Sequence, residues 1–335
     1  MYYKWLDRWD ERKAHRGDEV KESTPFVLDA QLAFPGAQKV ATIAEFCALA
    51  DRAVADPTFF HDRTPLENFE RKDGWIKFRS SVSTDTEMNN LVCAKVTKNR
   101  SSDQALVIFH HWNASSRYRQ IARFFSRRGI TVAEIAMPYH LERSRPTSSH
   151  ADYMLSANLG RTIQSVRQAV LDGQKLIRVL KNEGYGEISV LGMSLGSWVA
   201  GLAAAHDPTI KKASLFLAAG SMADMVLTGR ATRHIRASLQ GEINLVDLRR
   251  AWGPLNMENY ANGLARPDLD LQVVLAKRDL VVLPNLSKQF IKKLNQAGAT
   301  PDILELNCGH YSLSLPPHIL WAGLRVSKLL MHGRW

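Results

Sequence analysis

Short apolar and β-branched runs alternate with longer segments of helical period from about residue 71 onward. Apolar residues at helical spacing also recur between residues 163 and 180. This alternation predicts a mostly parallel, doubly wound α/β sheet with helices on both faces. The runs expected to form strands are 75–82, 91–96, 105–109, 130–137, 188–193, 213–218, 271–276 and 302–306.

Two segments interrupt this alternation. Residues 1–70 include Thr42 and Glu45 at the spacing of a capping box, and they predict an N-terminal helical extension. Residues from 221 to about 267 are polar, basic and of helical character, and they are too numerous for an ordinary crossover connection. We expect a helical lid insertion there, within an α/β catalytic domain that spans residues 71–335.

The composition is that of an ordinary globular protein, with 335 residues of which 45% are hydrophobic and 23% charged. Disordered and fibrous classes are therefore excluded. The uncharged stretch 188–205 reaches the length of a membrane span, but its glycines and serines favour a strand, a turn and a helix. Cys47, Cys93 and Cys308 match no disulfide framework or zinc motif, and the densely charged N-terminus lacks a signal-peptide core. We expect a cytoplasmic protein without a transmembrane segment.

A candidate nucleophile lies at the end of the strand expected over 188–193. The sequence Gly-Met-Ser-Leu-Gly over 192–196 precedes a helical run of small and apolar residues. This Gly-x-Ser-x-Gly pattern between a strand and a helix is typical of a nucleophile elbow, with Ser194 at its tip. Glycine is needed on both sides because larger residues would collide with the neighbouring strand and helix. The alternative is a tight turn without chemistry.

A nucleophilic serine needs a base and an orienting carboxylate. Asp279 follows the strand expected over 271–276, and His310 follows the last expected strand. Because carboxyl ends of parallel strands meet at one sheet edge, we expect Ser194, Asp279 and His310 to form a catalytic triad. The competing residues are Asp268 and Asp270, which precede their strand, and His318 and His332 in the terminal helical region.

An oxyanion formed at the acyl carbon needs hydrogen-bond donors. The backbone N–H of Leu195, which follows the nucleophile, is the first expected donor. The second donor should come from the loop after the third strand. We expect it to be the backbone N–H of Trp112, with that of His111 as the alternative.

These features resemble the α/β-hydrolase superfamily over about residues 75–335. Residues 136–140 and 308–311 look like those of abhydrolase-domain and dienelactone-hydrolase-like branches, although the dienelactone enzyme itself has a cysteine nucleophile where this chain has Ser194. In relatives the oxyanion loop often reads His-Gly-x, which places Trp112 at the donor position and His111 where the glycine stands. The resemblance implies a cofactor-independent serine hydrolase that cleaves a carboxylic ester or thioester through an acyl-enzyme.

The net charge of +11 bears on the substrate. Residues 95–128 hold eight basic residues and one acid, Asp103, and Arg230, Arg233 and Arg236 lie in the expected lid. This pattern indicates a small-molecule ester that is anionic or lipid-like, or else simply a solvated basic face. No recognition motif indicates nucleic acid.

The clustered histidines and the N-terminal aromatic residues do not change the expected function. His110, His111 and His140 fit no zinc motif, so we expect no metal and assign them to packing and loop hydrogen bonds. Aromatic residues near the N-terminus, Tyr2, Tyr3, Trp5 and Trp9, could cover the core or contact a membrane or a second subunit, and the oligomeric state stays open. Two alternative functions remain: an acyltransferase with the same triad, and a catalytically silent binding protein with this fold.

Overall fold

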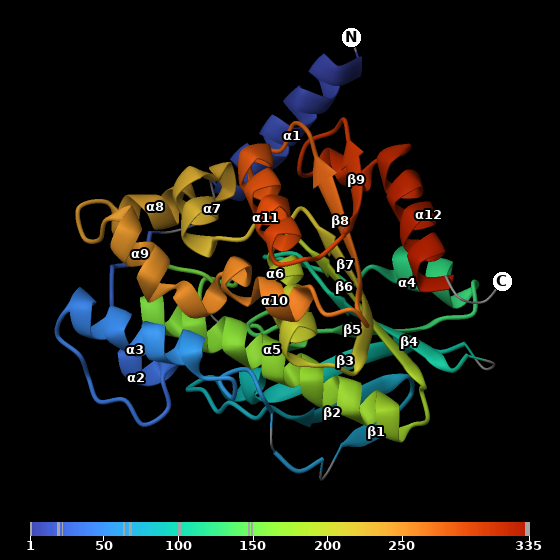
Figure 1. The fold of residues 1–335 in the computed structure, drawn as a ribbon, viewed down its shortest axis with the longest axis horizontal. Coiled ribbons are helices and arrows are strands. Elements are labelled where there is room, and N and C mark those ends of the chain that lie inside the picture. Colours follow the sequence, from blue (N-terminus) through green and yellow to red (C-terminus); the bar gives the residue numbers. More distant parts are fainter. Residues whose placement is uncertain are drawn as a thin grey trace.

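A mixed nine-stranded sheet runs through the centre of the part of the chain that the structure describes (Figure 1). The computed structural model describes residues 2–18, 21, 23–62, 64–66, 69–99, 102–146, 148 and 150–331. The strand order is β1-β2-β3-β5-β4-β6-β7-β8-β9. The strands are β1 (Glu70–Lys72), β2 (Trp75–Arg79), β3 (Leu91–Thr97), β4 (Gln104–Phe109), β5 (Thr131–Ile135), β6 (Glu187–Met193), β7 (Ile210–Phe216), β8 (Asp270–Ala276) and β9 (Asp302–Leu306).

The strands from β5 to β9 in this order pair in parallel, whereas β1, β2 and β3 pair antiparallel at one side. The mostly parallel sheet expected from the sequence is thereby confirmed. Every expected strand is present: β9 has the expected bounds and the others have shifted ends. β2 stops at Arg79 rather than residue 82. β1 was not expected, because its three residues are charged and exposed and carry no apolar signal.

Helices cover both faces of the sheet. Side chains of β4 alternate between the two faces: Val107 joins the core under α5, α6 and α11, and Leu106 joins the core under α4 and α12. Burial on both faces explains why the central strands read as continuous apolar runs. The helices are α1 (Tyr2–Asp18), α2 (Ala30–Ala33), α3 (Ile43–Ala55), α4 (Arg119–Ser126), α5 (Leu159–Asn182), α6 (Leu195–His206), α7 (Met222–Thr228), α8 (Arg233–Leu239), α9 (Leu245–Ala251), α10 (Ala261–Leu264), α11 (Pro284–Gln296) and α12 (His318–Met331). Short 3-10 turns include η3 (Arg230–Thr232) and η6 (Ser312–Ser314).

The residues before β1 form helices α1, α2 and α3. Thr42 Oγ1 accepts a hydrogen bond from the Glu45 N–H at 3.2 Å, and the Glu45 carboxylate accepts one from the Thr42 N–H at 3.0 Å. This is the capping box that the sequence predicts at the start of α3. α2 packs on α5 and α3 packs on α9, so the extension lies against the body of the molecule. Its boundary at residue 70 stays a prediction.

Residues 221–267 connect β7 to β8 and contain α7, α8, α9 and α10. The segment is helical, as expected, but its inner side is apolar: Leu248, Trp252 and Leu255 are fully buried. These side chains share one core with Phe46 of α3. A lid function for this insertion stays a prediction.

The uncharged stretch 188–205 forms most of β6, the following turn and most of α6, as the sequence analysis favoured. Within the described ranges, no helix has the length and apolar character needed to cross a membrane.

Candidate active site

Ser194 lies in a sharp turn between β6 and α6. Its φ of 52° lies in the left-handed region, where a residue with a side chain is strained. A Cβ on Gly192 would lie 2.2 Å from the Gly196 carbonyl oxygen, and a Cβ on Gly196 would lie 2.3 Å from the Phe109 carbonyl oxygen. Both glycines are therefore required by close backbone approach, and the strained turn presents the serine at the carboxyl edge of the sheet.

Asp279 and His310 follow β8 and β9 at the same edge. His310 Nε2 lies 3.1 Å from Ser194 Oγ, and His310 Nδ1 lies 2.7 Å from Asp279 Oδ2. Asp279 is 2% exposed. Its other oxygen accepts hydrogen bonds from the N–H groups of Val281 at 2.7 Å and Val282 at 2.8 Å. The structure thus brings together the three residues predicted as a triad.

This geometry fixes the direction of proton transfer. An ionised carboxylate only accepts hydrogen bonds, so the Nδ1–H of neutral His310 donates to Asp279. Nε2 is then left as the acceptor facing the Ser194 hydroxyl. The arrangement can remove the serine proton while Asp279 stabilises the imidazolium that results.

The peptide between His111 and Trp112 has a fixed orientation beside the elbow. The His111 carbonyl accepts a hydrogen bond from His110 Nδ1 at 2.8 Å, and the Trp112 N–H points the opposite way across the trans peptide. The N–H of His111 donates to the hydroxyl of Tyr118 at 3.2 Å. The Trp112 N–H has no hydrogen-bond partner among the described residues. This difference favours Trp112 over His111 as an oxyanion donor.

Leu195 is the first residue of α6, so its N–H is not used within the helix. The positive end of the helix dipole also lies there, which favours a developing negative charge. Leu195 begins α6, and Trp112 lies in the loop after β4. Gly196 lets these two segments approach closely because it has no side chain.

Two buried histidines hold the loop that carries Trp112. The Met137 N–H donates to His110 Nε2 at 3.1 Å, and the Asn113 N–H donates to His140 Nε2 at 2.9 Å. Burial lowers the pKa of His140 to about 3 and the pKa of His110 well below its ordinary value. Both rings are therefore neutral acceptors, which agrees with their assignment to packing and loop hydrogen bonds.

The competing residues lie elsewhere. Asp268 pairs with Lys211 at 2.6 Å and Asp270 begins β8, both at the amino edge of the sheet. His318 begins α12, and His332 lies outside the described residues. Across the described ranges, no three His, Cys, Asp or Glu side chains gather as metal ligands would. Cys47, Cys93 and Cys308 are buried free thiols.

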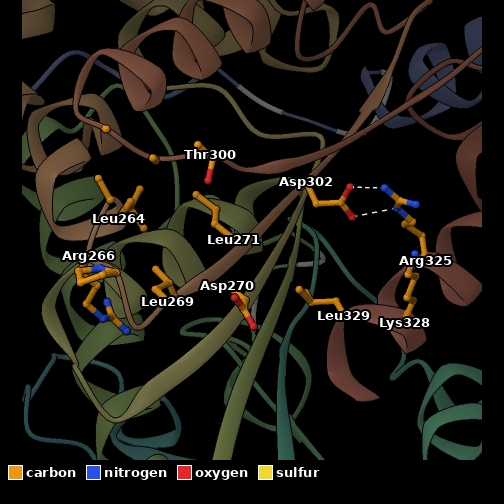
Figure 2. Close-up of a pocket in the computed structure, with 14 residues that line it drawn as sticks. Leu264, Arg266, Leu269, Asp270, Leu271, Thr300, Asp302, Arg325, Lys328 and Leu329 are labelled. Atoms are coloured by element: carbon orange, nitrogen blue, oxygen red, sulfur yellow. Dashed lines mark hydrogen bonds and ion pairs between the residues drawn. The ribbon is translucent and has the colours of Figure 1, made fainter. Parts of the chain in front are cut away.

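A cavity of about 390 Å³ lies at the amino ends of β8 and β9 (Figure 2). Leucine side chains line it together with Arg266, Lys328 and the ion pair between Asp302 and Arg325. Since Ser194 lies at the carboxyl ends of the strands, this cavity is separate from the candidate active site.

Part of the basic surface is neutralised. Arg117 pairs with Glu142 at 2.6 Å, and Arg230 pairs with Glu11 at 2.8 Å. The anionic or lipid-like character of the substrate stays a prediction. Near the N-terminus, Tyr2, Tyr3 and Trp5 are exposed on α1 instead of covering the core.

Tyr118 and Asp10 contact the candidate site but do not stand out in the sequence. The Tyr118 hydroxyl accepts a hydrogen bond from the His111 N–H. The Asp10 carboxylate accepts one from the Tyr311 N–H, next to His310. Neither residue belongs to a motif: the Asp10 contact joins segments about 300 residues apart, and the Tyr118 contact depends on the fold of the seven-residue stretch after His111. The acidic spacing Asp7, Asp10 and Glu11 was the one available signal, since it places three carboxylates on one helix face.

Comparison with solved structures gives clear matches at low sequence identity. An esterase from Pyrococcus furiosus is 14% identical, with 90% of this chain and 98% of that chain covered and a TM-score of 0.55. Acetyl xylan esterase 1 from a Thermoanaerobacterium species is 15% identical, with 94% and 97% covered and a TM-score of 0.59.

An acylaminoacyl peptidase from Pyrococcus horikoshii is 12% identical and has a TM-score of 0.57; the match covers 78% of this chain but 41% of the peptidase. No protein-family model and no curated protein sequence matches the chain. The sheet order, the turn at Ser194 and these structural neighbours together show that the chain has the α/β-hydrolase fold.

Proposed function

We propose that this chain is a serine hydrolase that cleaves a carboxylic ester, or a thioester, through an acyl-enzyme on Ser194. The observation that carries the proposal is the continuous hydrogen-bonded relay from Ser194 through His310 to Asp279, with distances of 3.1 and 2.7 Å. Several structural neighbours are named as esterases or acetyl xylan esterases, which supports ester hydrolysis, and others are named as peptidases, which cleave a related acyl bond.

The first half-reaction would form the acyl-enzyme. Ser194 Oγ attacks the acyl carbon as its proton passes to His310 Nε2, and the carbonyl electron pair moves onto the oxygen. The N–H groups of Leu195 and Trp112 would hold that oxyanion. When the tetrahedral intermediate collapses, the bond to the leaving group breaks and His310 protonates the departing oxygen or sulfur.

The second half-reaction would release the acid. A water molecule gives a proton to His310 Nε2 and attacks the acyl carbon, after which the ester bond to Ser194 breaks and the serine regains its proton. Asp279, buried and held by two backbone N–H groups, keeps the imidazole oriented in both steps. This chemistry needs no cofactor.

Substitution of the relay tests the mechanism. In a panel of chromogenic esters varied in acyl length and charge, Ser194→Ala and His310→Ala should each lower kcat by about 10⁴-fold or more, as triad deletions do. Ser83→Ala and His61→Ala are matched controls, because both side chains are exposed, and they should retain activity. A fluorophosphonate probe should label the wild type but not Ser194→Ala.

Two outcomes would contradict the proposal. A folded wild type that neither turns over any ester nor takes up the probe would indicate the catalytically silent protein. If an added alcohol or amine captured most of the acyl group in competition with water, the chain would be an acyltransferase with the same relay.

A further inference from the structure

The N-terminal helix α1 contacts the loop that carries His310, three hundred residues further along the chain. Asp10 of α1 is 7% exposed. One of its carboxylate oxygens accepts hydrogen bonds from the backbone N–H groups of Tyr311 at 2.7 Å and Ser312 at 3.0 Å. The other oxygen accepts one from the Ser312 hydroxyl. The two residues that follow His310 are therefore fixed by one side chain.

The residue before His310 belongs to the same network. The Gly309 N–H donates to Ser312 Oγ at 2.8 Å, so that hydroxyl links Gly309 to the Asp10 carboxylate. The packing is close, because a Cβ on Gly309 would lie 2.5 Å from the Asp10 carboxyl carbon. The loop is thus held to Asp10 on both sides of His310.

The same face of α1 contacts two neighbouring segments. Asp7 pairs with Arg278, which directly precedes Asp279, and Glu11 pairs with Arg230 of η3 at 2.8 Å. Figure 1 shows α1 near the carboxyl ends of β8 and β9, where Asp279 and His310 follow these strands. The ion pairs of Asp7 and Glu11 are partly or largely exposed, so Asp10 is the buried contact among the three.

We propose that Asp10 is a positioning residue for His310: its carboxylate holds the loop 309–312 so that Nε2 faces the Ser194 hydroxyl. This inference rests on the proposed function. Asp10 contacts the backbone of this loop and the Ser312 hydroxyl rather than the reacting atoms. A small displacement of a catalytic base lowers the rate steeply, by up to about 100-fold for roughly 1 Å.

The decisive measurement compares kcat and KM in Asp10→Ala, Asp10→Asn and the matched control Glu11→Gln. With rates expressed per folded protein, Asp10→Ala should lower kcat by about 100-fold and leave KM within about twofold. Asp10→Asn should recover part of that loss, because its amide oxygen can still accept the two backbone N–H groups. Glu11→Gln removes a carboxylate from the adjacent position of the same helix and should keep wild-type kcat.

A second readout does not depend on activity. Amide hydrogen exchange at Tyr311 and Ser312 should be faster in Asp10→Ala than in the wild type, because both N–H groups lose their acceptor. Ser312→Ala breaks the same network. The fold-loss in kcat of the double variant Asp10→Ala/Ser312→Ala should therefore be smaller than the product of the fold-losses of the two single variants.

The outcomes separate this inference from the proposed function. If the wild type shows Ser194-dependent turnover and folded Asp10→Ala keeps kcat within twofold, Asp10 does not position the base. A loss of total activity that matches the loss of folded fraction, or no recovery of kcat in Asp10→Asn, would reduce Asp10 to a structural contact. If the wild type shows no turnover, the proposed function fails, while the exchange measurement still decides whether Asp10 holds the loop. If Asp10→Ala does not fold, Asp10→Asn and Ser312→Ala carry the same comparison.

Discussion

Individual buried side chains beside the active site are kept uncharged by their surroundings. His140 is 2% exposed, and both of its ring nitrogens are used: one donates to the Pro138 carbonyl at 2.8 Å and the other accepts the Asn113 N–H. Protonation would remove that acceptor and bury a charge that no carboxylate among the described residues pairs with. Burial of this ring therefore links the loop that carries Trp112 and Asn113 to pH.

The pKa of His140 predicts a stability change with pH. Its pKa is about 3 in the folded protein against an ordinary 6.5, so below pH 6.5 the unfolded chain binds a proton that the folded chain does not. Stability from this group is complete above pH 6.5 and is lost as the pH falls towards 3, by about 2 kcal/mol at pH 5. His110 acts in the same direction.

Urea unfolding at pH 7 and pH 5 measures this effect. His140→Gln keeps an amide oxygen that can accept the Asn113 N–H but does not titrate. The variant should lose about 2 kcal/mol less than the wild type between the two pH values. The same loss in both proteins would show that His140 is not the group responsible.

At the scale of elements, the elbow depends on how closely α6 approaches β4. A methyl group on Gly196 would lie 2.3 Å from the Phe109 carbonyl oxygen and 2.5 Å from the His110 carbonyl oxygen, both of them rigid backbone atoms. Neither can rotate away as a side chain would, so the loop and the helix must separate.

Gly196→Ala should therefore damage both stability and catalysis. We expect a destabilisation of about 1–3 kcal/mol, typical of forced overpacking, and a loss of turnover of about 100-fold because Leu195 and Trp112, the proposed oxyanion donors, move apart. Gly186→Ala is the matched control, since its nearest neighbour would be the Asp103 carbonyl oxygen at 4.0 Å. Urea unfolding and ester turnover give the two readouts; a Gly196→Ala protein as active as the control would contradict the assigned packing.

The elements were largely predictable from the sequence, and their mutual contacts were not. Alternation of apolar runs located the strands, and the rule that catalytic groups follow strand ends placed Asp279 and His310 at one edge. Periodicity indicates which face of a helix is buried but not what covers it. The acidic face of α1 is visible in the sequence, but its contact with Ser312 is not, and neither is the contact of Tyr118 with His111.

At the scale of the whole molecule, helices α2 and α3 and the insertion share one core with the sheet. Phe46 of α3, Trp252 of the insertion and Val107 of β4 belong to a single cluster of buried side chains. A segment that contributes to the common core cannot unfold alone without exposing the rest.

We therefore predict a single unfolding transition. Calorimetry should give one peak with equal calorimetric and van't Hoff enthalpies, and fluorescence and circular dichroism should give coincident midpoints. Two resolved peaks would show that residues 1–70 or the insertion fold as independent units.

The contact between Asp10 and the loop after β9 also bears on how much of the chain a working protein needs. The strand pattern alone suggests that a shortened version could start just before β1, near residue 70. Such a truncated protein would keep Ser194, Asp279 and His310 but would lose the carboxylate that Tyr311 and Ser312 bind. Minimal versions designed for expression or for transplanting the active site should therefore retain the first helix.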